Sequence, residues 1–194
     1  MSNARNLASF LGTGTKVPSS NMPSGTVLKV QTNPITAFGK TDLTTSYADV
    51  AGTEQSFTRA VSNSKILVCW NLKLTTFQNV FIKMNRKIGS GSYAVVNAGA
   101  TGTDGGRTSQ GGVLGTFYNT TSVNAMGYGI HAYQYTFLDE AGEGLTDTTD
   151  AITYKITVAA PNTTSDFFLN ISGYDGNNYN YTTESSVTFM EIAG

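Results

Sequence analysis

The stretch "KILVCWNLKL", residues 65–74, decides the fold because its side chains change in kind at every second position. One face of this segment carries only apolar side chains, namely Ile66, Val68, Trp70, Leu72 and Leu74. The other face carries Lys65, Leu67, Cys69, Asn71 and Lys73. Successive side chains of a β-strand point to opposite sides, so a period of two indicates a strand with one buried face. We therefore predict a half-buried strand here.

The same alternation recurs along the chain. It is clear in "NVFIKMNRKI" (79–88), "AITYKITVAA" (151–160) and "DFFLNIS" (166–172). Weaker strand candidates lie at 25–32, 45–51, 55–61, 112–118, 126–140 and 185–192. About eight to ten such strands, joined by turns rich in Gly, Asn and Asp and without an internal helical pattern, predict an all-β antiparallel sandwich of the jelly-roll type.

The chain of 194 residues is long enough to form one domain without a disulfide or a metal. We predict an anchoring arm and linker over 1–24, followed by the sandwich domain over 25–194. The single cysteine, Cys69, rules out a disulfide framework within the chain and is expected to be a small buried hydrophobe. A net charge of −1 without a basic run argues against nucleic-acid binding. We also expect no secretory leader and no membrane span.

The N-terminal segment "NARNLASFLGTG" (3–14) is the exception to the strand pattern. Ala4, Leu7, Ala8 and Leu11 fall on one side of a short helix, and so short a helix is marginal on its own. A spacer rich in Gly, Thr, Ser and Pro follows. Two interpretations stay open: a terminal segment without a role, or an arm that docks on a partner through Leu7, Phe10 and Leu11.

Two predicted strands have apolar side chains on both faces. In the first strand the outer face still holds Leu67 and Cys69, and in 128–139 the aromatic face of His131 and Tyr133 lies opposite a face with Ile130 and Leu138. Such strands are either covered within the domain or lie at a subunit interface. We favour the interface and expect an oligomer.

Catalytic and metal-binding patterns are sparse. His131 is the only histidine, so a Ser-His-Asp arrangement or a zinc site would have to use it, and a structural histidine is the favoured interpretation. Carboxylates gather in "LDEAGEGLTDTTD" (138–150), namely Asp139, Glu140, Glu143, Asp147 and Asp150. Calcium is an alternative there, but the EF-hand register is missing and a solvated hairpin loop is favoured. We predict no enzyme, no cofactor and no metal.

The segment "SGYDGNNYNYTTE" (172–184) is the best candidate for surface recognition. Tyrosine rings can stack on sugars, and asparagine amides can bond to sugar hydroxyls. The residues concerned are Tyr174, Asn177, Asn178, Tyr179 and Tyr181. The alternative is a hairpin tip, because Asp-Gly and Asn-Asn also form turns.

Several segments together resemble a family of phage virion proteins common in marine and cyanobacterial phages. They are "MPSGTVLKVQ" (22–31), "SYADVAG" (46–52), "SNSKILVCWNLKL" (62–74), "GTDGGRTS" (102–109), "YTFLDEAG" (135–142) with "AITYKITV" (151–158), and "SSVTFMEIAG" (185–194). The resemblance covers about residues 22–194, and "ARNLASFLGTG" (4–14) is similar to the N-termini of such proteins. It implies a trimeric jelly-roll sandwich displayed on a virus particle, without catalytic residues.

The resulting hypothesis is a non-enzymatic phage virion structural protein, either a capsid-decoration (cement) protein or a short fibre protein. It would be a homotrimer assembled in the host cytoplasm and located in the virion, and it would dock on a capsid or tail protein by its arm. It would then stabilise the shell or contact the host surface, including host polysaccharide, with no nucleic-acid or membrane partner. Alternatives are a tail-fibre receptor-binding module, a free carbohydrate-binding module and, more remotely, a hydrolase.

Overall fold

A computed structural model gives the fold. The structure describes residues 22–76, 80–96, 103–104, 107–108, 113–117, 130–160, 165–171 and 182–194. The first of two large sheets contains β1 (Val27–Ile35), β2 (Gly39–Leu43), β5 (Lys65–Thr76), β11 (His131–Asp139), β13 (Ser165–Leu169) and β14 (Ser185–Ile192). The second contains β3 (Ala48–Asp49), β4 (Gln55–Phe57), β6 (Val80–Ile88), β7 (Ala94–Val95), β10 (Val113–Phe117) and β12 (Ile152–Ala159). A small third sheet pairs β8 (Thr103–Asp104) with β9 (Arg107–Thr108).

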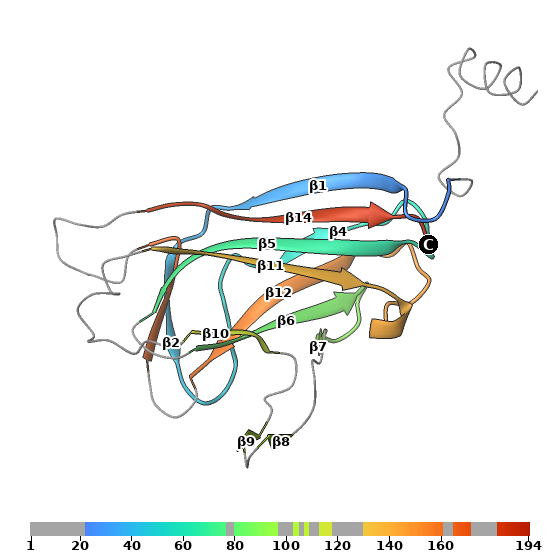
Figure 1. The fold of residues 1–194 in the computed structure, drawn as a ribbon. Coiled ribbons are helices and arrows are strands. Elements are labelled where there is room, and N and C mark those ends of the chain that lie inside the picture. The colour runs from blue at the N-terminus through green and yellow to red at the C-terminus, as the bar shows by residue number, and fades with distance from the viewer. Residues whose placement is uncertain are drawn as a thin grey trace, which may run out of the picture.

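The pairing of the strands is nested. β1 pairs with β14, β3 and β4 pair with β12, β5 pairs with β11, and β6 pairs with β10, all antiparallel. Each pair therefore lies inside the previous one along the chain. The result is the order β1-β14-β5-β11 in the first sheet and β3/β4-β12-β6-β10 in the second (Figure 1). This is a jelly roll, which confirms the predicted fold class.

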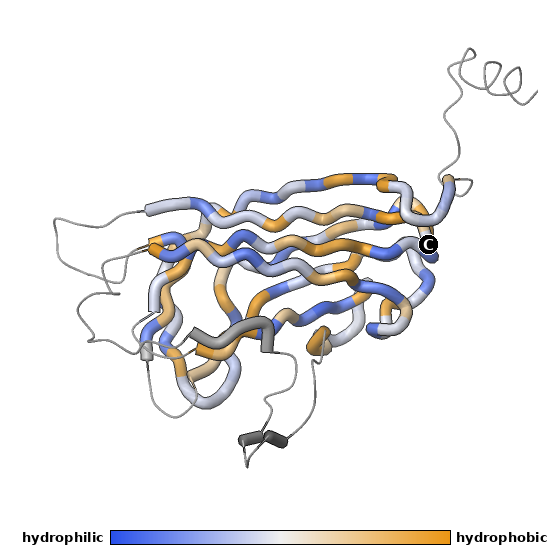
Figure 2. Tube along the Cα trace, in the orientation of Figure 1, coloured by the Kyte–Doolittle hydropathy of each residue, from blue (hydrophilic) through white to orange (hydrophobic). Residues whose placement is uncertain are grey.

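The strands follow the predicted alternation. In β5 the five residues from Ile66 to Leu74 on the apolar face are all buried, while the opposite face is half-buried. Figure 2 shows the same change of hydropathy along neighbouring strands. Trp70 lies at the centre of the core and its Nε1 donates to the Met84 sulfur at 3.2 Å. The two sheets thus meet through inward side chains of strands that the sequence already identified.

The first sheet contains a longer central strand and one more strand than the sequence predicted. β5 has twelve residues and needs two successive partners on one edge: β14 pairs with Lys65–Asn71, and β13 pairs with Leu74–Thr76. β2, which the sequence pattern did not reveal, continues this layer by pairing with β13. The chain therefore bends between β1 and β2, and again after β13. The predicted strand 45–51 is shorter than expected, because only Ala48–Asp49 pairs.

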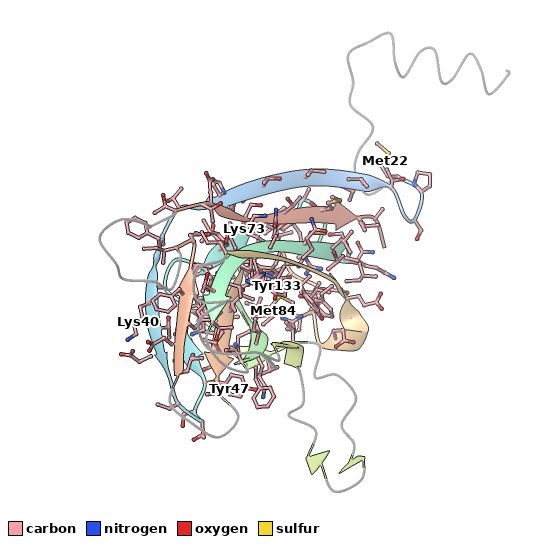
Figure 3. The ribbon with its side chains drawn as sticks, turned by 60° about the vertical axis from the view of Figure 1, so that its left-hand side comes forward. Met22, Lys40, Tyr47, Lys73, Met84 and Tyr133 are labelled. Atoms are coloured by element: carbon pink, nitrogen blue, oxygen red, sulfur yellow. The ribbon has the colours of Figure 1, made fainter. Side chains whose placement is uncertain are left out.

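The only helix in the described part of the chain is the 3₁₀ turn Ala141–Glu143. The predicted N-terminal helix lies outside the described residues. Met22 lies at the end of the sandwich where the chain finishes at Gly194, whereas Lys40 on β2 lies at the opposite end (Figures 1 and 3). We call these the arm end and the far end.

A buried ion pair at the arm end corrects one expectation about the carboxylates. Asp139 is fully buried and pairs with Arg86, and it accepts a 2.7 Å hydrogen bond from the Tyr154 hydroxyl. Arg86 also donates to the Glu143 carbonyl at 3.1 Å. Burial is the main cause, and the electrostatic interaction with Asp139 the second, that raises the pKa of Tyr154 well above its ordinary value. The phenol therefore stays protonated and donates its hydrogen bond. Asp139 is therefore a core residue rather than part of a solvated loop.

Two further buried charges, Glu191 and Arg59, fasten the loops at the same end. The Glu191 carboxylate is fully buried and accepts from the backbone N–H of Ala60 and Val61 and from the Ser64 hydroxyl, at 2.7–2.8 Å. The Arg59 guanidinium donates to carbonyls of Ser64, Thr146 and Thr148. These bonds join the loop before β5 to the loop before β12. Each charge has bonded partners, as a buried charge requires.

The Arg86–Asp139 pair should dominate stability at the arm end. Replacing Asp139 by Asn leaves the Arg86 charge buried without its counter-ion, so the free energy of unfolding should fall by about 3–5 kcal/mol. Denaturant titration followed by fluorescence of Trp70, the only tryptophan, measures this loss. The exposed pair Lys40–Asp42 is the matched control, because Asp42→Asn should cost less than about 1 kcal/mol. Equal effects of the two substitutions would contradict the assignment.

Candidate functional site

A row of apolar side chains crosses the outer face of the first sheet. The strand register aligns Val30 on β1 with Met190 on β14, Met190 with Leu67 on β5, and Leu67 with Leu138 on β11. Val30 is 56% exposed and Leu138 is 37% exposed, while Met190 and Leu67 between them are half-buried. We call these four residues the apolar row. With strands about 4.8 Å apart, the row is roughly 14 Å long.

The neighbouring row is polar but uncharged. It consists of Thr32, Thr188, Cys69 and Thr136, which the same register places side by side. The hydroxyls of Thr32 and Thr188 lie 2.9 Å apart, and the Thr136 hydroxyl lies 3.7 Å from the Cys69 sulfur. Cys69 is therefore a half-buried thiol on the outer face, which corrects its prediction as a small buried hydrophobe. Neither row contains a charge that a partner would have to desolvate.

The outer face of the second sheet carries more charge, although Val95 is 42% exposed there. It presents Lys83, Lys87 and Lys155. Lys83 lies 4.1 Å from the centre of the Tyr47 ring, and Lys155 lies 4.0 Å from that of Tyr93. Lys155 also pairs with Asp49 at 2.6 Å, and Lys87 pairs with Glu54 at 3.1 Å. This face is charged and internally paired, as expected for a surface in contact with water.

A shallow, open depression lies at the far end. Its lining residues are Thr36, Phe38, Thr182, Thr183 and Glu184, and its volume is about 380 Å³. Phe38 is 65% exposed, the highest value among the large apolar side chains of the described residues. The lining combines an aromatic ring, hydroxyls and one carboxylate, groups that can contact a ligand rich in hydroxyls.

Asn170 holds the backbone around this depression. It is fully buried and has the left-handed φ of 58°. Its side-chain amide donates to the carbonyls of Ile35 (2.6 Å) and Ala37 (2.8 Å), and its side-chain oxygen accepts from the Ser185 hydroxyl (2.6 Å). Its backbone bonds to the Lys73 carbonyl and to the Thr183 N–H. One residue thus fixes the bends on both sides of the depression.

The two predicted contact segments lie outside the described residues. These are the arm residues Leu7, Phe10 and Leu11, and the recognition residues Tyr174, Asn177, Asn178, Tyr179 and Tyr181. The described residues beside them do show where each segment is attached. Met22 places the arm at the arm end. The bridge between Ile171 and Thr182 closes the base of the recognition segment at the far end, beside the depression.

The catalytic and metal candidates do not converge in the described part of the chain. His131 on β11 is half-buried, and its Nε2 is buried without a hydrogen-bond partner. Asp139 is held by Arg86, and Glu140 pairs with Lys65 at 2.7 Å. Among the described residues, no group of three or more His, Cys, Asp or Glu side chains is arranged to hold a metal ion. Nor does any described helix have the length and apolar character of a membrane span.

Comparisons with known proteins give only distant likenesses. Neither protein-family models nor curated proteins match the chain. Among solved structures it is similar to VP2 of infectious bursal disease virus in a subviral particle, with a TM-score of 0.39 and 9% identity over 84% of this chain and 40% of that chain. It is also similar to infectious bursal disease virus Gt strain, with a TM-score of 0.37 and 11% identity over 86% and 37%. This chain thus spans less than half of those chains, and likenesses this distant carry no conclusion about its function.

Two substitutions at Asn170 separate the contribution of its side-chain hydrogen bonds to stability from that of its left-handed backbone conformation. Asn170→Ala removes the side-chain bonds and keeps a Cβ in the left-handed region, so we expect a loss of about 2–4 kcal/mol. Asn170→Gly removes the same bonds but tolerates the positive φ, and should be about 1 kcal/mol more stable than the Ala variant. Denaturant titration measures both. An Ala variant as stable as the Gly variant would contradict a strained position.

Proposed function

We propose that this chain is a non-enzymatic phage virion structural protein, displayed on the particle as a homotrimer of the decoration (cement) or short-fibre type. Its arm docks on a protein partner in the particle, and its far end projects outward to contact the host surface. The chain would assemble in the host cytoplasm and reside in the virion. The family resemblance of segments such as "SSVTFMEIAG" (185–194) supports the virion setting.

The observation that carries this proposal is the apolar row. Its residues lie on the outer face of the first sheet and are not part of the hydrophobic core. A continuous apolar row beside an uncharged row is typical of a face that packs on another protein. The outer face of the second sheet differs from it, because Lys87 and Lys155 form ion pairs there with Glu54 and Asp49.

The arrangement of the ends fits display on a particle. Met22, in the arm segment, lies at one end, while Lys40 lies at the other (Figure 3). Phe38 of the depression is two residues before Lys40, and Thr182, which lines the depression, also closes the base of the recognition segment. A protein attached by its arm would therefore present these features away from the attachment point. Gold-labelled antibody against the chain should accordingly label the surface of phage particles that contain it.

Light scattering tests the proposed trimer by measuring the molecular mass of the purified protein in solution. We expect the mass of three chains, whereas Leu67→Lys, which places a charge in the middle of the apolar row, should give the 20.6 kDa single chain. The control is Ser56→Lys at an exposed position of the second sheet, which should keep the trimer. A single-chain mass for the unmodified protein at all concentrations would overturn the proposed assembly.

A second candidate function is receptor or carbohydrate binding, as in a tail fibre or a free binding module. The depression at the far end favours it, because the exposed ring of Phe38 lies among three threonine hydroxyls and the Glu184 carboxylate. The lining contains no cationic residue among those described. It therefore suits a neutral sugar better than an acidic one.

An array of purified neutral and acidic bacterial polysaccharides tests this candidate. The unmodified chain should bind a neutral polysaccharide, and Phe38→Ala should weaken that binding about fivefold, because the loss of ring stacking removes on the order of 1 kcal/mol. Phe38→Tyr keeps the ring and should keep the binding. Binding that is indifferent to both substitutions would place any sugar site elsewhere.

A further inference from the structure

We infer that the apolar row is the docking site for the N-terminal arm of a second copy of this chain. This inference rests on the proposed function, in which the row is a protein contact and the arm binds a partner in the particle. It departs from that proposal in one respect: the arm's apolar residues bind the next copy of the trimer, whose row they cover, and the arm end of the assembled trimer then faces the particle.

Both the arm and the apolar row carry apolar side chains that a contact between them would bury. The arm carries Leu7, Phe10 and Leu11 in a segment too short to form a stable helix unaided. The row offers an apolar surface in which Val30 and Leu138 remain substantially exposed. Each therefore has apolar area to bury, and contact between them would bury both.

The charges are compatible as well. Residues 1–21 contain Arg5 and Lys16 and no acidic residue. The apolar row and the threonine row beside it are uncharged, and the nearby Lys65 is paired with Glu140. A weakly cationic arm therefore meets no unpaired cation along this surface. A strongly acidic partner, by contrast, would find no cation in the two rows to bind.

The attachment point of the arm is fixed close to the row. The Gly25 N–H donates to the Ala193 carbonyl at 3.0 Å, and the Ala193 N–H donates to the Thr26 carbonyl at 2.8 Å. These bonds fasten the start of the chain against the end of β14. Val30 follows Gly25 by five residues, so the near end of the row is within about 17 Å of this point.

The linker is long enough for the arm to reach a neighbouring copy. Residues 12–21 can span up to roughly 33 Å when extended, and Pro18 and Pro23 favour extended backbone. This length exceeds the distance to the arm's own row, so the row of a neighbouring copy is also within reach. An arm that covered its own row would leave that row unable to contact another copy, so the proposed trimer favours exchange of arms. When each of three copies gives one arm and receives another, the head-to-tail contacts can close a ring.

The single cysteine makes a direct test possible. Cys69 lies on the outer face, in the row next to Leu67. One protein is the unmodified chain, whose only thiol is Cys69, and the other carries Ser9→Cys in the arm together with Cys69→Ser. The two are mixed, incubated to exchange subunits, oxidised and separated on a denaturing non-reducing gel, with a tag on one to mark its size.

We expect a mixed disulfide that contains one chain of each kind and that forms at least tenfold faster than either like pair. Thr13→Cys with Cys69→Ser, which places the thiol in the spacer, is the matched control and should form little of it. A Cys69–Cys69 dimer without the mixed species would show that two sheet faces meet, and would overturn the inference. The inference would also be overturned if a chain that carries Ser9→Cys and keeps Cys69 formed only an intramolecular disulfide between these two residues.

Light scattering separates failure of this inference from failure of the proposed function. Leu67→Lys and the pair Leu7→Ser with Leu11→Ser should each reduce the trimer to single chains, while Thr13→Ala with Thr15→Ala should not. If only Leu67→Lys dissociates the trimer, the row is a contact surface but the arm is not its occupant. If neither dissociates it, the row is not the trimer contact and this inference fails, while the proposed trimer stands.

Discussion

The structure depends on the position of β5, a twelve-residue strand that is paired along both edges and packed on its inner face. β11 occupies one edge, and β14 followed by β13 occupies the other. Its inner side chains, with Trp70 at the centre, form the middle of the core against β6. Because β5 is held on three sides, its outer face is the only one left for contacts beyond the domain.

Buried polar residues fix the two ends of this sandwich. At the arm end, Asp139 pairs with Arg86, Glu191 accepts from backbone N–H groups and Arg59 donates to backbone carbonyls, and these bonds tie the loops to the sheets. At the far end, Asn170 does the same by hydrogen bonds to carbonyls at the bend of β1. Such groups are expensive to leave unpaired, so they define one arrangement of the loops. The faces between the ends are then free to differ in chemistry.

That difference between faces is what connects the fold to assembly. The second sheet shows paired lysines to water, whereas the first shows the apolar row from Val30 to Leu138. A jelly roll by itself specifies no function, because the same sandwich serves many purposes. The function proposed for this chain therefore rests on one outer face, on the arm attached beside it and on the depression at the opposite end.

The sequence by itself determined the fold class and the direction of most strand side chains. The period of two in "KILVCWNLKL" and in 151–160 indicates which face of each strand is buried. This pattern lies within a single segment, so it can be recognised without the tertiary structure. It also marked Leu67 and Cys69 as apolar outer positions. The interpretation of Cys69 as buried was wrong because its side chain lies on the outer face of β5, where it is half-buried. The interpretation of Asp139 as part of a solvated loop was wrong because its burial depends on Arg86 on β6, a partner distant in the sequence.

Only the tertiary structure decided which residues share a surface. Val30 and Met190 are far apart in the sequence, and antiparallel register alone makes them neighbours in the apolar row. The same holds for Phe38 and Glu184 in the depression, and for Asn170, whose buried bonds reach across the sheet. Periodicity records which side of a strand is buried, but register and chain bends set what lies beside it, and these arise from contacts between distant segments.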